Sequence, residues 1–188
     1  MPRTITHELK LQNAREPFVT FLAQTDGLAE KRGPILVQLP PSLSFDASVV
    51  TSFLDLVRTV YNGPVLCEPR HATWFSSAVA SLLDHYEISR VAADPPHVPE
   101  ATVPAGWPRV AYFRLHGSPR KYWSRYDEND IARFAATVRS IPTADEVWCV
   151  FDNTASGAAI ENARELRDRL SVDPSRDPSG SGNSSTGV

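Results

Sequence analysis

Short apolar runs alternate with amphipathic stretches along most of the chain. The runs end at proline, glycine or polar residues, and they predict buried strands over residues 35–40, 64–69, 88–94, 110–117 and 146–153. Between the strands, apolar residues recur at helical spacing and predict helices that begin at Asp46, at Ser76, at Asp127 and after Asn153. An extended stub at Arg3–Thr6 and a helix over residues 14–31 are expected before the first strand.

This order of elements indicates a parallel sheet. Strands that alternate with helices favour right-handed βαβ units, and strands that are apolar throughout are typical of sheets covered on both faces. We therefore expect one α/β domain over residues 1–170. The segment 171–188 is expected to be a disordered tail, because 11 of its 18 residues are Ser, Pro or Gly.

Polar side chains gather where the predicted strands end. They are Thr6 and His7, Gln38, Glu68 with Arg70 and His71, Asp94, Arg114 with His116, and Asp152 with Asn153. The carboxyl ends of parallel strands share one edge of a sheet, where ligands bind. This pattern favours a shared pocket at that edge, and ordinary polar loop beginnings are the alternative.

Arg114 is expected to lie inside the sheet layer. Side chains alternate along a strand, so Arg114 and His116 share one face while Leu115 points the other way. An unpaired buried guanidinium is costly, so Arg114 needs either a bound anion or a carboxylate, for which Glu68 and Asp94 are the natural candidates. A salt bridge that only braces the core is the alternative.

The histidines of this edge suit hydrogen bonding or acid–base chemistry, because imidazole titrates near neutral pH. With the neighbouring carboxylates, His7, His71 and His116 could instead hold a metal ion, but no HxH or HExxH spacing occurs and no metal ligand is assigned. No P-loop, GxGxxG motif or nucleophile elbow is present. The basic and aromatic stretch SPRKYWSRY (118–126) could cover an anionic, ring-bearing ligand or simply pack as a loop.

Composition excludes several classes of protein. The chain has 188 residues, a net charge of −3 and 41% hydrophobic residues, which is typical of globular proteins. No run approaches the roughly 20 apolar residues of a membrane span, and the slightly acidic balance gives no strong signal for nucleic-acid binding. Cys67 and Cys149 sit in apolar runs and predict buried thiols, while the polar N-terminus is unlike a signal peptide. We expect a cytoplasmic protein.

Several motifs together resemble the domain of unknown function 72 family, also called YecE-like proteins. The matching stretches are PRTITHELKL (2–11), GPILVQLPPSLSFD (33–46), CEPRHATWF (67–75), AAD (92–94), YFRLHGSPRKYWSRY (112–126) and VFDNTASGAAIENARELRDRL (150–170). The signature positions carried over by motif are Thr6, His7, Gln38, Glu68, Arg70, His71, Trp74, Asp94, Arg114, His116, Gly117, Tyr126, Asn153, Gly157 and Asn162.

The resemblance implies a TIM-barrel-like fold with parallel strands, truncated at the N-terminus. The family's first strand, which contains glycine and tryptophan, and its glutamate–asparagine motif are not found here, so this chain begins at about the third strand. A full barrel takes roughly 250 residues, and residues 1–170 supply about five and a half βα units. Such a barrel has unpaired sheet edges, which favour self-association.

Three functional hypotheses stay open. The first is a hydrolase acting on a phosphate-bearing or nucleotide-like substrate, with catalytic candidates Glu68, His71 and His116. Its ligand-binding candidates are His7, Gln38, Arg70, Asp94, Arg114, Tyr126 and Asn153. The second hypothesis is a module that binds a small anionic ligand without catalysis, and the third is a truncated remnant without activity. The sequence identifies no cofactor.

Overall fold

The computed structural model describes residues 1–141 and 143–171, so nearly all of the predicted tail lies outside the described residues. The α-helices are α1 (Arg15–Thr25), α2 (Ala47–Val60), α3 (Ser77–His85), α4 (Glu128–Arg139) and α5 (Ala158–Ser171). The strands are β1 (Ile35–Gln38), β2 (Val65–Glu68), β3 (Ile88–Arg90), β4 (Ala92–Asp94), β5 (Ala105–Gly106), β6 (Val110–Leu115) and β7 (Glu146–Phe151). None of the described helices is long and apolar enough to cross a membrane.

The strands form two sheets that share one predicted strand. The first sheet has the order β1-β2-β3-β5 and the second has the order β4-β6-β7. All pairs are parallel except β3 with the two-residue β5. Only Val91 separates β3 from β4, so the strand expected over residues 88–94 passes from one sheet into the other. The α/β class is confirmed, but the described residues form no closed barrel.

Helix capping explains where three of the helices begin. The Asp46 side chain accepts hydrogen bonds from the backbone N–H groups of Ser48 and Val49, and the Ser76 hydroxyl accepts one from Val79. Asp127 forms a capping box with Asp130 at the start of α4. Each cap satisfies backbone donors that lack partners inside the helix. The helix starts predicted at Asp46, Ser76 and Asp127 are therefore confirmed.

The first residues differ from the prediction. Arg3–Thr6 is not an extended stub, because Thr4–Glu8 forms a turn of π-helix that buries Ile5 and Thr6. Its backbone groups bond within the turn, where the Leu9 N–H donates to the Thr4 carbonyl, so the described segment does not pair with a strand. The helix expected over residues 14–31 is also shorter, because α1 ends at Thr25 and a 3-10 segment follows.

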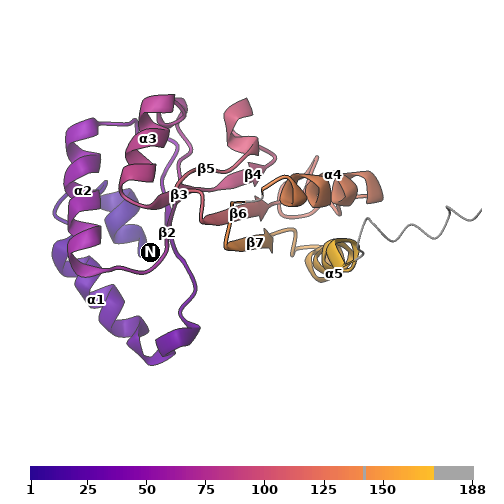
Figure 1. Cartoon of the computed structure of the whole chain (residues 1–188), viewed down its shortest axis with the longest axis horizontal. Coiled ribbons are helices and arrows are strands. Elements are labelled where there is room, and N and C mark those ends of the chain that lie inside the picture. The colour runs from indigo at the N-terminus through magenta and orange to yellow at the C-terminus, as the bar shows by residue number, and fades with distance from the viewer. Residues whose placement is uncertain (142, 172–188) are drawn as a thin grey trace, which may run out of the picture.

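Apolar side chains form one core at each end of the molecule. Figure 1 shows α1, α2 and α3 at one end and α4 and α5 at the other, with the strands between them. The first core contains Phe18, Phe53 and Val37, and the second contains Phe113 and Phe134. Helices thus cover the outer face of each sheet, as continuous apolar strands predict.

The inner faces of the strands carry an apolar layer followed by a polar layer. Leu66, Val91 and Val110 form a small buried cluster against the half-buried Leu36 and Tyr112. Two positions further along their strands, the same faces carry Gln38, Glu68 and Arg114. The polar layer therefore lies at the carboxyl ends of the strands, above an apolar floor.

Both cysteines are free thiols. Cys67 of β2 is buried as predicted, and burial raises its pKa to about 12. Cys149 is only half-buried, which differs from the prediction and follows from the position of β7 at the end of its sheet, and burial raises its pKa to about 11. Neither thiol is therefore an activated nucleophile at neutral pH.

Among the described residues, the first sheet ends at β1 and β5 and the second ends at β4 and β7. Of these four edge strands, β1 and β7 are the longer ones. The terminal amine of Met1 donates a hydrogen bond to the Leu36 carbonyl of β1 over 3.0 Å. Trp148 of β7 stays 40% exposed, although its ring approaches Gly33 just before β1. Such edges can pair with another chain, and the expected self-association stays a prediction.

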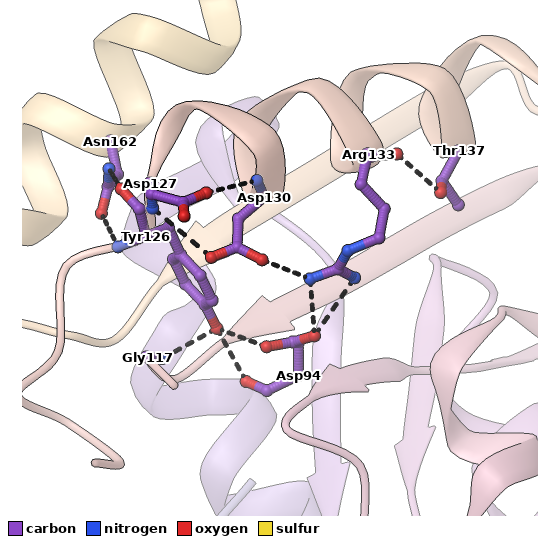
Figure 2. A network of polar contacts seen from close by, with 8 residues as sticks. All are labelled: Asp94, Gly117, Tyr126, Asp127, Asp130, Arg133, Thr137 and Asn162. Atoms are coloured by element: carbon purple, nitrogen blue, oxygen red, sulfur yellow. Dashed lines mark hydrogen bonds and ion pairs between the residues drawn. The ribbon is translucent and has the colours of Figure 1, made fainter. Parts of the chain in front are cut away.

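A buried tyrosine joins β4 to the loop after β6 and to α5 (Figure 2). The Tyr126 hydroxyl accepts a hydrogen bond from the Gly117 N–H over 2.8 Å and donates to Asp94 Oδ1 over 2.9 Å. The Asn162 side chain bonds the backbone N–H and carbonyl of Tyr126, each over 3.0 Å. Burial raises the pKa of Tyr126, and the Asp94 carboxylate raises it further. This network fixes both ends of the segment 117–126.

We expect Tyr126→Phe to lower the free energy of unfolding by about 1–3 kcal/mol, because it leaves the buried Gly117 N–H without an acceptor. Urea denaturation monitored by circular dichroism measures the change. Tyr86→Phe is the matched control, since its hydroxyl donates to Asp55 at the surface and water can replace that bond. Equal losses in the two variants would contradict the role given to the buried hydroxyl.

Candidate functional site

The Arg114 side chain of β6 donates hydrogen bonds to acceptors from three other parts of the fold. Its Nη1 donates to Gln38 Oε1 of β1 over 2.9 Å and to Glu68 Oε2 of β2 over 2.7 Å, and its Nη2 donates to Asp152 after β7. The Arg114 side chain is 15% exposed and that of Glu68 is 3% exposed. Glu68 is confirmed as a partner of Arg114, whereas the expected contact with Asp94 is wrong.

Asp94 does not face Arg114, because the register of β4 with β6 pairs Asp94 with Leu115, whose side chain points to the other face. Asp94 Oδ2 lies 3.3 Å from Arg133 Nη1 of α4, and its Oδ1 accepts from Tyr126 (Figure 2). Asp94 is the last residue of β4, and its side chain therefore joins the second sheet to α4. The carboxylate beside Arg114 is Asp152, which the sequence places at a strand end and offers as a possible metal ligand but not as a partner of Arg114.

Opposite charges keep the central pair ionised despite burial. Burial by itself raises the pKa of Glu68, but the adjoining His116 ring and the charges of Arg114 and Arg70 bring it below its usual range. Burial likewise lowers the pKa of Arg114, while Glu68 and Asp152 more than compensate and raise it. Glu68 is therefore a carboxylate at neutral pH.

His116 lies between the same two carboxylates. The ring is 3% exposed, with Nδ1 at 3.1 Å from Asp152 Oδ2 and Nε2 at 3.8 Å from Glu68 Oε1. Gly117 follows with φ +89°, and a Cβ there would meet the Ser124 carbonyl oxygen at 2.7 Å. Only glycine allows this turn, which brings the segment 117–126 back against the end of β6.

One oxygen at the centre of the cluster lacks a hydrogen bond. Within the described part of the chain, the buried Glu68 Oε1 has no hydrogen-bond partner. Arg70 Nη2 lies 3.5 Å from this oxygen, beyond good hydrogen-bond distance, and Arg70 Nε is also buried without a partner there. Arg70 and His116 thus approach a buried acceptor that neither of them satisfies. Such a group is costly unless a ligand or water completes it.

Further cationic and titratable groups surround Arg70. Burial lowers the pKa of His7, and the charges of Arg3 and Arg70 lower it further. Burial also lowers the pKa of His97, and Lys121 and Arg70 add to that effect. The sequence places Lys121 in the basic stretch 118–126 that could cover an anionic ligand, and His97 in a loop without an assigned role. Only the fold brings the charges of Lys121 and Arg70 to act on the same His97 ring.

Three other predicted residues have contacts within the fold. His71 caps the short helix Ala72–Trp74, where its Nδ1 lies 2.9 Å from Thr73 Oγ1. Asn153 is fully buried and donates to Ser124 O and Asn162 Oδ1, and Tyr126 is fully buried in the same network. Their assignment as catalytic or ligand-binding groups stays a prediction.

No metal centre is apparent in residues 1–141 and 143–171, since no three His, Cys, Asp or Glu side chains there are arranged to hold an ion. A groove of about 810 Å³ lies between α4 and α5 and is lined by Ile131, Arg139, Glu165 and Arg169 among others. It is separate from Arg114 and its partners.

The candidate site is therefore the group of polar side chains around Arg114 at the carboxyl ends of the strands. We call it the strand-end cluster, and it consists of Gln38, Glu68, Arg70, Arg114, His116 and Asp152.

Comparisons with known proteins agree with the sequence motifs. A family model described as "Protein of unknown function DUF72" matches residues 1–183. A crystal structure of a DUF72 family protein from Thermotoga maritima is 25% identical, with a TM-score of 0.76 over 90% of this chain and 71% of that chain. One from Enterococcus faecalis is 23% identical, with a TM-score of 0.71 over 88% of this chain and 73% of that one. No functionally curated protein matches.

We expect Glu68→Gln to cost about 1.5–3 kcal/mol of stability at neutral pH, because it removes a charged partner of Arg114. The pKa of Glu68 is lowered by folding, so its stabilisation is complete above the unfolded value of about 4.3 and is lost as the pH falls through the lower folded value. The stability difference between wild type and variant should therefore shrink below about pH 4. Urea denaturation across this range measures it.

Glu161→Gln provides the control for that experiment. Glu161 pairs with Arg125 at the surface, where the two side chains are 60% and 53% exposed, and solvent screens their charges. A smaller stability change is expected for it at every pH. A cost of Glu68→Gln that did not vary with pH would contradict the stated linkage.

Proposed function

Because this chain belongs to the DUF72 family of unknown function, we propose its function from the strand-end cluster: it binds a small phosphate-bearing ligand and hydrolyses it by acid–base catalysis. The observation that carries this proposal is the position of His116, buried between Asp152 and the unsatisfied oxygen of Glu68. An imidazole between two carboxylates, beside the guanidinium of Arg70 and an acceptor without a partner in the described residues, is an arrangement suited to general acid–base chemistry.

A TIM-barrel-like arrangement is part of the proposal. The parallel strands follow the chain order β1, β2, β3–β4, β6 and β7, and helices lie outside them. In that architecture ligands bind at the carboxyl ends of the strands. The strand-end cluster occupies this position, which supports the assignment of the site.

Arg70 is the better anion contact in this proposal. Arg114 already donates to three acceptors, two of them carboxylates, and a ligand would have to displace one of these. Arg70 has a single acidic neighbour at 3.5 Å, and its Nε is unsatisfied within the described residues. Lys121 and Arg70 both act on His97, so Lys121 adds a second positive charge around that ring. Arg114 then acts as a positioning residue for Glu68 and Asp152.

His116 would supply the base. In this proposal a proton on Nδ1 faces Asp152 Oδ2 at 3.1 Å, where the described residues do not yet form a hydrogen bond, and the Nε2 lone pair lies on the side of Glu68. The Glu68 Oε1 carboxylate oxygen can accept a hydrogen bond from a water molecule and orient it. In the hydrolytic step Nε2 takes a proton from that water, the water oxygen bonds to phosphorus, and the bond from phosphorus to the leaving oxygen breaks. The leaving oxygen then takes the proton from His116, so the histidine is regenerated.

Binding is tested with inorganic phosphate by isothermal titration calorimetry. We expect Arg70→Gln to weaken phosphate binding about 10- to 150-fold. This factor corresponds to the loss of one hydrogen bond to a charged group, which contributes about 1.5–3 kcal/mol. Arg167→Gln is the control, because Arg167 is exposed on α5 and pairs only locally with Asp168. Failure of the wild-type protein to bind phosphate would refute the proposed site.

Turnover is tested by phosphate release from a panel of phosphate monoesters. We expect His116→Gln to lower kcat by about 10²- to 10⁴-fold, the typical contribution of a general acid–base residue, while phosphate still binds. Phosphate binding by the wild type without turnover of any panel member would refute the hydrolytic step. The alternative of a non-catalytic binding module would then be favoured.

A further inference from the structure

Tyr122 has an unusual backbone conformation for a bulky residue. Its φ is +65°, a left-handed value that costs energy for side chains other than glycine. The conformation is held from both sides, because the Tyr122 N–H donates to the His116 carbonyl and the Tyr122 carbonyl accepts from the Ala155 N–H. These bonds tie the residue to the ends of β6 and β7. Its side chain is nevertheless 48% exposed.

The exposed Tyr122 ring lies beside the proposed base. Its centroid is 5.4 Å from that of the His116 ring, with the planes at 77°. His116 is 3% exposed, so the phenol covers it while keeping much of its own surface open. Aromatic surface left open beside a cluster of polar side chains is suited to stacking with a planar group.

The other aromatic residues of the segment 118–126 are occupied differently. Trp123 is 46% exposed, but the Arg120 guanidinium lies 4.6 Å from the centroid of its ring, and the structure records no contact between this ring and His116 among the described residues. Tyr126 is fully buried in the network of Figure 2. Within this segment, Tyr122 is thus the aromatic residue that presents an open ring next to His116.

Positive charge lies near this ring as well. Lys121 precedes Tyr122, and its charge acts on His97 together with that of Arg70. Arg70 approaches the same oxygen of Glu68 as His116 does, at 3.5 Å and 3.8 Å. An open aromatic ring and an anion contact therefore flank one histidine.

We propose that Tyr122 is a specificity-determining residue whose ring stacks on a planar ring of the ligand, which makes the ligand a nucleotide. This inference rests on the proposed phosphate site and adds a requirement that the site itself does not impose. Stacking of a base on an aromatic side chain contributes about 5- to 150-fold in affinity. The strained backbone is consistent with a ring held in place before the ligand binds.

The experiment compares adenosine monophosphate with ribose phosphate, two probes that differ only in the adenine ring. We expect the wild-type protein to bind adenosine monophosphate about 5- to 150-fold more tightly by calorimetry. Tyr122→Ala should abolish this preference without changing the affinity for ribose phosphate, and Tyr122→Phe should retain it. Trp123→Ala is the neighbouring control and should also retain the preference. Circular dichroism melting confirms that each variant folds.

The outcomes separate the two proposals. Equal wild-type affinities for the two probes, or a preference that survives in folded Tyr122→Ala, would overturn the stacking role and leave the phosphate site standing. Loss of affinity for ribose phosphate in Tyr122→Ala would also overturn it, because the ring would then serve the anion contact. If neither probe nor inorganic phosphate binds, the proposed function fails and the inference fails with it.

Discussion

The buried guanidinium of Arg114 is the interaction on which the carboxyl ends of the strands depend. It connects β6 to three residues that are distant in the sequence, Gln38, Glu68 and Asp152. A cation that is 15% exposed is stable only when such acceptors surround it. The two sheets are also joined by the passage of β3 into β4 and by the apolar cluster of Leu66, Val91 and Val110. The polar contacts of Arg114 connect β1 and β2 to the end of β7 across the inner face.

The same contact sets the chemistry of the neighbouring side chains. Because Arg114 neutralises Glu68 and Asp152 together, both carboxylates can lie close to His116 without repelling each other strongly. Within the described residues Glu68 Oε1 has no hydrogen-bond partner, and neither has Nε of Arg70, whose Nη2 lies 3.5 Å from that oxygen. A core built only for stability would satisfy these groups internally. The unsatisfied groups lie where a parallel α/β fold binds its ligands.

A second polar network supports the site from outside. Tyr126 and Asn162 fix one end of the segment 117–126, and the turn at Gly117 fixes the other. The segment is thereby pressed against the ends of β6 and β7, and Tyr122 is left with its backbone strained and its ring open beside His116. Rigid support of this kind allows an exposed aromatic side chain to keep one orientation.

The sequence by itself determined the order of strands and helices, the caps at Asp46 and Ser76, and the shared face of Arg114 and His116. These features depend on side-chain periodicity and local hydrogen bonding, and both are determined by residues that are close in the sequence. Only the tertiary structure decided that Asp152 rather than Asp94 pairs with Arg114, because the strand register places Asp94 level with Leu115 and Val150 level with Arg114, so that Asp152 lies on the face of Arg114. It also decided that the first residues form a helical turn, and that one predicted strand divides between two sheets. Those outcomes depend on contacts between distant segments, which no local pattern encodes.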